Sequence, residues 1–451
     1  MPSKIEDNSV EEMLDYSQAP FYTKENDKSS PYEIVFWMCI VASLMLVVYL
    51  RVTRMLDLDW VFIIYSLAVS FTILARYVFY HLFNPKLLPA GAWSPSVQVI
   101  LPCMNESDRV YKTAKSLYNQ DYPKDKLSVI IVNDGSTDDT DEWLLKINQD
   151  FGWSISTLSS NQGKRAAIAK GMKNNKSEIT VLMDSDVILS SNSISEIVRG
   201  FSGYNVAAVC GNTSVANENK NILTRVQSQY YYISYRTFKS SEAYFRTVLC
   251  CNGCFSAYRS DRLFSVMDEW QSQTFLGTKR TFSDDRSLTN LLLKEGWDTV
   301  YHPGAKSSTY VPEKLSEYVN QQTRWRKGFF IESVYALKSM WRRPFGGAFL
   351  FYMNFFLGLM VPVVLGYYIL INPISHGVNP FGYVGAIFMI TLLHQIFFLI
   401  FREADALNIG YLALITAVPL WTFAAIILIP LALLTIKGTR WLTRSHSSET
   451  K

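Results

Sequence analysis

Two carboxylates separated by a single residue follow an apolar segment: Asp184 and Asp186 come directly after Ile179–Met183. Transfer of a group from a nucleoside diphosphate releases a charged diphosphate, which a divalent cation can neutralise. Carboxylates at the end of a strand suit Mg²⁺ or Mn²⁺, hard cations that prefer oxygen ligands and keep positions open for phosphate. Because Asp-x-Asp triplets also occur by chance in loops, the preceding apolar segment is what makes this one a candidate metal and nucleotide site.

Two polar clusters earlier in the chain suit a nucleotide. Asp134 lies in Asn133–Ser136, where its carboxylate can bind a base, although Asp and Gly are also common in turns for conformational reasons alone. The segment Asn161–Arg165 carries a Gly-Lys-Arg turn at the start of a predicted helix, where backbone N–H groups and the Lys164 and arginine cations suit phosphate. Each cluster is weak evidence alone and stronger as part of an ordered series.

A second pair of carboxylates, Asp284 and Asp285, precedes a predicted helix over Ser287–Lys294, with Arg286 next to them. A carboxylate beside a donor sugar can be the general base that deprotonates an acceptor hydroxyl. Acidic residues are also common in the first turn of a helix, where they stabilise its N-terminus. From this motif alone, the catalytic and structural interpretations have equal weight.

The most specific element is the sequence Gln321-Gln322-Thr323-Arg324-Trp325. On a helix, Gln321, Arg324 and Trp325 occupy positions i, i+3 and i+4 and share a face. An arginine suits bidentate binding of diphosphate oxygens, and a tryptophan suits stacking on the apolar face of a sugar. A belt of Trp and Arg at a membrane surface would explain these residue types but not their order.

Three short apolar segments must position these side chains: Val97–Leu101, Ser128–Val132 and Ile179–Met183. Each ends in a polar cluster and is followed by a helical pattern, which is typical of an α/β domain with a mostly parallel sheet. Ligands bind such sheets outside the carboxyl ends of the strands. We therefore expect one crevice to collect the acidic clusters.

The composition adds a membrane part to this domain. The 451 residues are 49% hydrophobic and 18% charged, which is too apolar for a plain soluble enzyme and too polar for helices alone. Segments near 20 apolar residues can cross a bilayer. The candidate spans are Ile34–Leu50, Trp60–Phe83, Phe349–Ile371, Phe381–Phe401 and Ile409–Ile436.

The charges next to these spans favour a cytosolic catalytic domain. Arg51 and Arg54 argue against this orientation, but the basic segments after the domain outweigh them. To keep the basic C-terminal tail on the same side, we predict that 409–436 is a re-entrant hairpin broken by Pro419 and Pro430, rather than one long helix.

The resulting layout has six parts. They are a disordered cytosolic tail at 1–31 without a signal peptide, two transmembrane helices in 32–84, a cytosolic catalytic domain at 94–315, basic amphipathic helices at the membrane surface in 316–345, C-terminal transmembrane helices in 346–436 (two spans and the hairpin), and a basic cytosolic tail at 437–451.

Charge and cysteine content exclude other classes. A net charge of +4 gives no indication of a nucleic-acid partner. The cluster Cys250–Cys254 lacks the second cysteine pair or the histidines that a zinc site needs, so we interpret its cysteines as reduced thiols.

The ordered series resembles the processive family-2 glycosyltransferases with a GT-A fold, namely cellulose, chitin and hyaluronan synthases and the nodulation chitin-oligosaccharide synthases. The resemblance covers nearly the whole chain. It implies that Asp134 contacts uridine, that Lys164 lies near the diphosphate, and that Asp184 and Asp186 form the metal and nucleotide motif, with Asp186 as the metal ligand.

On the acceptor side, the resemblance implies that Asp285 is the catalytic base. It also implies that Gln321, Arg324 and Trp325 form the QxxRW signature, which binds the diphosphate and the acceptor sugar. The membrane helices would then form a channel through which the polymer leaves.

The local amino-acid sequence is most similar to that of hyaluronan synthases at Gln273–Gly277, Asp284–Asn290 and Phe329–Ser333. Two positions depart from that pattern. Ser283 replaces the usual Gly before Asp-Asp-Arg, and Asn252-Gly253-Cys254 replaces Ser-Gly-Pro. The Cys250-Cys251 pair resembles chitin-type enzymes instead, so the acceptor sugar stays open. Further candidate site residues are Asp284, Arg286, Asn252, Gly253 and Cys254.

We therefore expect a processive, inverting β-glycosyltransferase of the plasma membrane that functions as a monomer among membrane lipids, with a growing polysaccharide as acceptor. Its expected donors are UDP-glucuronate and UDP-N-acetylglucosamine, which give hyaluronan. The alternative is a chitin-type product from UDP-N-acetylglucosamine alone. Two other interpretations are a non-processive lipid glycosyltransferase and a transporter with a nucleotide sensor. Neither explains all the motifs of the ordered series.

Overall fold

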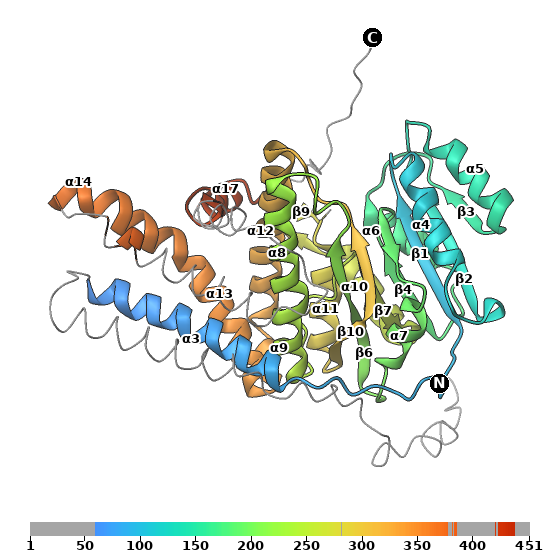
Figure 1. The fold of residues 1–451 in the computed structure, drawn as a ribbon, viewed down its shortest axis with the longest axis horizontal. Coiled ribbons are helices and arrows are strands. Elements are labelled where there is room, and N and C mark those ends of the chain that lie inside the picture. Colours follow the sequence, from blue (N-terminus) through green and yellow to red (C-terminus); the bar gives the residue numbers. More distant parts are fainter. Residues whose placement is uncertain are drawn as a thin grey trace, which may run out of the picture.

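The computed structural model describes residues 59–280, 282–377, 381, 383–385, 420 and 423–437. A mixed eight-stranded sheet with the order β3-β2-β1-β4-β7-β6-β10-β5 crosses the centre of this part (Figure 1). Its strands are β1 (Val97–Cys103), β2 (Leu127–Asn133), β3 (Ser154–Thr157), β4 (Ile179–Met183), β5 (Val187–Leu189), β6 (Val206–Val215), β7 (Phe255–Arg259) and β10 (Asp298–Thr309). A separate hairpin pairs β8 (Thr274–Phe275) with β9 (Thr278–Lys279).

The three predicted strands are confirmed and adjacent. β1 lies between β2 and β4 and is parallel to both, with Val97 opposite Leu127 on one side and Ile179 on the other. The carboxyl ends of β2, β1 and β4 therefore meet at one edge of the sheet, as the sequence predicts. β7 runs antiparallel to β4 and to β6, which makes the sheet mixed.

Alternating apolar side chains of the strands build a core on each face of the sheet. In β1, Val99 and Leu101 pack on one face, with α4, α5 and α7, while Ile100 packs on the other, with α6, α10 and α11. The helices of the α/β part are α4 (Asp108–Tyr118), α5 (Thr140–Phe151), α6 (Lys164–Met172), α7 (Ser193–Arg199), α8 (Ile222–Tyr232), α9 (Lys239–Tyr244), α10 (Ser260–Ser272) and α11 (Asp284–Lys294). Short helical turns η1 (Lys124–Lys126) and η2 (Ile233–Phe238) complete it.

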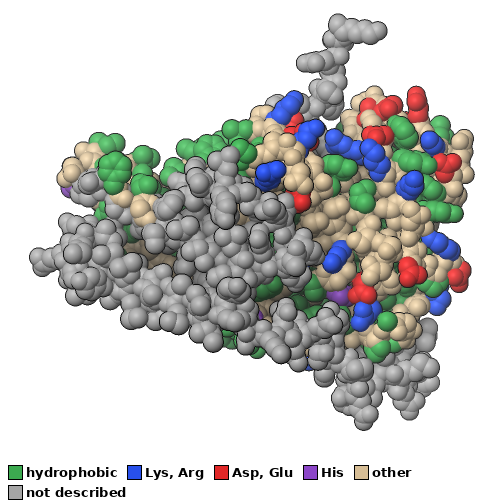
Figure 2. All heavy atoms as spheres, in the orientation of Figure 1, with side chains coloured by type: hydrophobic (Ala, Val, Ile, Leu, Met, Phe, Trp, Pro, Cys, Tyr) green, Lys and Arg blue, Asp and Glu red, His purple; other side chains and the backbone are tan. Residues whose placement is uncertain are grey.

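Two helices in the described part are long and apolar enough to cross a membrane, Trp60–Leu82 and Phe345–His376. The first is α3, and the second is made of α13 (Phe345–Gly366), η4 (Tyr367–Ile371) and α14 (Asn372–His376). They extend away from the sheet in Figure 1. In Figure 2, the charged side chains visible on this face lie mainly over the α/β part.

Much of the predicted membrane part lies outside the described residues. This holds for the span Ile34–Leu50, for most of Phe381–Phe401, and for the first part of the hairpin at 409–436. The end of that hairpin is described as η5 (Ala424–Leu428) and α17 (Ile429–Leu434). Both tails, 1–31 and most of 437–451, also lie outside.

The predicted amphipathic segment at 316–345 is α12 (Leu315–Ala336) followed by η3 (Met340–Arg342). One of the basic residues of this segment does not lie on a surface. Arg343 is buried, and its guanidinium lies 2.9 Å from Asp298 and donates to the carbonyl of Gly296. It ties the segment to β10, because a buried cation needs a paired anion.

Candidate active site

Asp134, at the end of β2, binds the loop that leads into α6. Its carboxylate accepts backbone N–H groups from Gln162 at 2.7 Å and from Gly163 at 2.9 Å. Burial raises the pKa of Asp134, and these two N–H groups oppose that shift. Gly163 has a φ of +91°, which suits glycine, and α6 begins directly after it. Asp134 therefore positions the candidate phosphate loop.

A cavity of about 510 Å³ adjoins Asp134 at the ends of β2 and β3. Its lining includes Met104, Asn133, Ser136, Thr157 and Asn161. A space of this size and mixed polarity can hold one small ligand. Its lining includes Asn133 and Gly135, the two neighbours of Asp134 in the chain.

Lys164, the first residue of α6, forms an ion pair with Asp184 at the end of β4. Burial lowers the pKa of Lys164, but Asp184, Asp284 and Asp285 outweigh this effect, so the pKa is raised overall. Gly253 closes over the pair, since a Cβ at this position would lie 2.9 Å from the Lys164 ammonium. The loop Asn252–Cys254 thus abuts the candidate donor site.

Asp186 accepts a hydrogen bond from the Thr309 hydroxyl at 3.4 Å. Asp184 and Asp186 also raise the pKa of the Cys254 thiol, although burial is the largest cause. Within the described ranges, no group of three or more His, Cys, Asp or Glu side chains could hold a metal ion. Two carboxylates with diphosphate oxygens still fit Mg²⁺ or Mn²⁺, because such ions keep several positions for phosphate and water.

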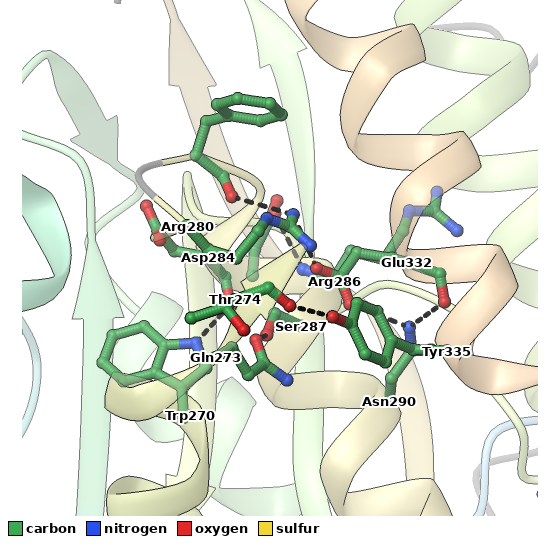
Figure 3. A network of polar contacts seen from close by, with 12 residues as sticks. Trp270, Gln273, Thr274, Arg280, Asp284, Arg286, Ser287, Asn290, Glu332 and Tyr335 are labelled. Carbon is green, nitrogen blue, oxygen red and sulfur yellow. Dashed lines mark hydrogen bonds and ion pairs between the residues drawn. The ribbon is translucent and has the colours of Figure 1, made fainter. Parts of the chain in front are cut away.

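The neighbouring carboxylates Asp284 and Asp285 have different surroundings. Asp284 is buried and pairs with Arg165 at 2.7 Å, and its backbone carbonyl accepts from the Trp270 indole at 3.2 Å (Figure 3). Asp285 instead accepts the backbone N–H of Gly253 at 3.2 Å, on the side of the loop next to Lys164. Asp284 is thus a structural anchor, whereas Asp285 faces the candidate site.

The expectation that the arginine of the Gly-Lys-Arg turn serves phosphate is wrong. Arg165 is buried and directed to Asp284, to the Trp270 carbonyl at 2.6 Å and to the Gln273 side chain at 3.1 Å. The carboxylate of Asp284 is buried in the core and needs a cation as its partner, and Arg165 of α6 provides that cation.

On α12, Arg324 of the predicted signature interacts with the same carboxylates. Burial lowers the pKa of Arg324, and the charges of Asp184, Asp285 and Asp284 oppose this shift, which places its guanidinium near them. The side-chain carbonyl of Gln321 is buried and accepts no hydrogen bond from the described residues. A buried polar atom without a partner is costly, so this carbonyl is a candidate for contact with a ligand.

Two tyrosines that the sequence analysis missed extend this site. The ring of Trp325 lies 6.2 Å from that of Tyr231, which stacks on Tyr235 at 4.9 Å. Burial raises the pKa of Tyr231, and the charges of Asp186 and Asp184 add to the shift. Tyr231 and Tyr235 stand four residues apart, across α8 and η2, and this i, i+4 aromatic spacing was the available signal.

The structure explains the unusual Ser283 before Asp284. Ser283 has a φ of +62°, a conformation that favours glycine. Its side chain fits only because α12 presents Gly328 opposite: a Cβ at 328 would lie 2.7 Å from both the Cβ and the Oγ of Ser283. The segment before Asp285 and the signature helix therefore touch at this pair.

Gly328→Ala should impair both stability and turnover. Overpacking of this kind costs about 1–3 kcal/mol, and a displaced Ser283 would shift the carboxylate of Asp285, where a misplacement near 1 Å can cost about 10²-fold in rate. Ser283→Gly in the same chain removes the clash and should restore most of both. Thermal unfolding measures stability, and release of the expected nucleotide product measures turnover. Ser283→Gly alone is the matched control, and a double variant as impaired as Gly328→Ala would contradict the contact.

Comparison with known proteins now identifies the family. A family model described as "Glycosyltransferase like family 2" matches residues 95–328, just over half of the chain. A hyaluronan synthase of Streptococcus pyogenes serotype M1 is 28% identical over 359 residues, 77% of this chain and 83% of that protein. An N-acetylglucosaminyltransferase of Mesorhizobium japonicum is 32% identical over 255 residues, 55% of this chain, and the match spans only 59% of that relative's length.

Among solved structures, a mannosyltransferase, PcManGT from Pyrobaculum calidifontis in complex with GDP-Man and Mn²⁺, matches with a TM-score of 0.56 at 18% identity. The match covers 83% of this chain and 98% of that one. At this identity the likeness shows the fold alone, and it confirms the predicted GT-A fold of the α/β part. The chain belongs to the glycosyltransferase-like family 2.

Proposed function

We propose that this protein is a processive, inverting β-glycosyltransferase that uses UDP-sugar donors and a growing polysaccharide as acceptor. The observation that carries the proposal is the convergence of two cations, Lys164 and Arg324, on the carboxylates Asp184 and Asp285. The cations suit a diphosphate, and one carboxylate stays available for proton transfer.

In the proposed mechanism, Asp285 takes the proton from an acceptor hydroxyl. The hydroxyl oxygen forms a bond to the anomeric carbon of the donor sugar, and the bond from that carbon to the UDP oxygen breaks on the opposite face, which inverts the configuration. Lys164 and Arg324 stabilise the charge that develops on UDP. Mg²⁺ or Mn²⁺ would be held by Asp186 with Asp184 and, when bound, would neutralise diphosphate charge.

Trp325 supports the proposed acceptor site. Its indole lies against Tyr231 on the side of α12 that bears Gln321 and Arg324, and aromatic faces bind sugar rings. In this proposal the donor occupies the sheet edge at Asp134 and Lys164, and the acceptor terminus lies between Asp285 and Trp325.

A cavity of about 370 Å³ between α3, α12 and α13 supports the proposed exit path for the polymer. We propose that the membrane helices form this path, that the chain crosses the plasma membrane several times with its catalytic domain in the cytosol, and that the six-part layout holds. Function as a monomer is part of the same proposal.

For the product, hyaluronan is our first assignment and a chitin-type polymer is the second. The relatives include a hyaluronan synthase and N-acetylglucosaminyltransferases, whose names fit either assignment. The Cys250-Cys251 pair resembles chitin-type enzymes and so favours the second assignment. The loop that follows it, Asn252–Cys254, departs from the hyaluronan-synthase pattern and contacts Asp285 and the Lys164–Asp184 pair through Gly253.

The purified protein should release UDP and form polymer only when both UDP-glucuronate and UDP-N-acetylglucosamine are supplied. Each donor is tested singly and together, and the product is digested with hyaluronidase or chitinase. Formation of a chitinase-sensitive polymer from UDP-N-acetylglucosamine alone would replace the first assignment by the second. No turnover with any pair would contradict the choice of donors.

A further inference from the structure

The cavity between the membrane helices and α12 carries two arginines. Arg76 comes from α3 and Arg326 from α12, and the remaining lining includes Gln322, Asn354 and Tyr318. Gln322 and Arg326 stand four residues apart and face this cavity, while Gln321 and Trp325 on the adjoining face belong to the candidate active site. The cavity and the proposed acceptor site thus lie on adjoining faces of α12.

The two arginines differ in their partners. Arg76 lies 3.1 Å from the carboxylate of Glu242 on α9, and its guanidinium also lies over the Phe238 ring. Within the part of the chain that the structure describes, Arg326 donates to Gln322 alone, to the backbone carbonyl at 3.1 Å and to the side-chain oxygen at 2.8 Å. It forms no ion pair with any carboxylate in the described ranges.

Among the described residues, the titratable groups that act on Arg326 are two tyrosines. Burial lowers its pKa, and the only opposing groups are the hydroxyls of Tyr230, on α8, and Tyr318, on α12. The described lining of the cavity contains no carboxylate, and Glu242, which pairs with the lining residue Arg76, also accepts the backbone N–H of Leu249. A half-buried guanidinium without an anion is costly, and an anionic ligand in the cavity would remove that cost.

We infer that this cavity binds a carboxylate-bearing sugar chain and that Arg326 pairs with its carboxylates. The inference rests on the proposed function, because the emerging product would supply the chain. Aromatic rings and amides, here Tyr65, Tyr230 and Asn354, suit sugar rings and hydroxyls. A glucuronate-containing polymer presents one carboxylate in each disaccharide, whereas chitin presents none, so Arg326 would favour the former.

Binding of oligosaccharides to the full-length protein in phosphatidylcholine nanodiscs tests this inference. The ligands are a hyaluronan octasaccharide and its carboxyl methyl ester, which differ only in charge. The wild type should bind the acid at least about 10-fold more tightly, because the ester cannot form the charge-assisted hydrogen bonds that a carboxylate forms with a guanidinium. Arg326→Gln should lose this preference, Arg326→Lys should keep most of it, and UDP binding monitors folding in each variant.

Equal binding of acid and ester by the wild type, or an unchanged preference in Arg326→Gln, would overturn the inference. A phospholipid phosphate shares the anionic chemistry, so the assay is repeated with phosphatidylglycerol in the nanodiscs. If that lipid abolishes the preference of the wild type and leaves Arg326→Gln unaffected, the cavity is a lipid site and the inference fails. A wild type that prefers the acid but polymerises UDP-N-acetylglucosamine alone would keep the cavity assignment and reject the proposed product.

Discussion

Asp285→Asn should lower turnover by about 10²–10⁴-fold, the usual contribution of a general base, while UDP binding stays nearly unchanged. The amide has the same shape and can still accept the N–H of Gly253, which Asp285 accepts at 3.2 Å, but it cannot take a proton from a hydroxyl. Release of UDP under saturating donor measures turnover, and calorimetric titration with UDP measures binding.

The adjacent carboxylate provides the matched control. Asp284→Asn removes the charge that pairs with the buried Arg165 and should lower the thermal unfolding temperature, whereas Asp285→Asn should leave it close to that of the wild type. Normal turnover in Asp285→Asn would refute the assigned base. Equal losses of UDP affinity and turnover in that variant would instead assign Asp285 to donor binding.

The sheet edge could be predicted from sequence because its signals are local. Apolar segments of about five residues that end in polar clusters encode both the strands and the positions of Asp134 and Asp184. The topology rule for parallel sheets then brings their carboxyl ends together. The register of β1 with β2 and β4 confirms this step.

The division of roles between neighbouring polar residues could not be predicted. Asp284 and Asp285 are adjacent and of one type, and their difference arises from Arg165, 119 positions from Asp284 along the chain. The partner of Arg343 is likewise distant, on β10. Periodicity and motif spacing carry no information about which buried anion a cation meets, because that choice depends on packing between elements.

The Ser283–Gly328 contact could not be predicted from the sequence either. The resemblance to hyaluronan synthases implies that a serine stands where those enzymes usually have glycine, but it does not explain why the serine is tolerated. The close approach of α12 supplies the reason, since the side chain that is added at one position is absent at the other. The membrane part was predicted from apolar length alone, and α3 and α13 agree with two of the proposed spans.

Arg280→Met should destabilise the catalytic domain by about 3–5 kcal/mol, as expected when one partner of a buried ion pair is removed. The guanidinium of Arg280 lies 2.8 Å from the carboxylate of Glu332, and both side chains are almost fully buried. This pair joins α12 to the segment after β9 that leads to Asp284, and Asn290 of α11 donates to the backbone carbonyl of Glu332 at 3.0 Å (Figure 3). Chemical denaturation of the purified protein measures the loss.

The pH dependence of this variant separates an orphaned charge from a simple loss of packing. Burial raises the pKa of Glu332, and Arg280 is the first group that opposes the shift, so the carboxyl of Arg280→Met should have a folded-state pKa further above its unfolded value. A group of this kind binds its proton more tightly when folded, so the deficit should shrink as pH is lowered from about 8 to about 6, towards the raised pKa. Arg280→Met with Glu332→Leu removes both charges and should recover much of the stability without that pH dependence. A deficit that is independent of pH, or a double variant less stable than the single one, would mean that the two side chains matter through their volume. The junction between α12 and the carboxylate segment would then depend on packing at Ser283 and Gly328 rather than on this ion pair.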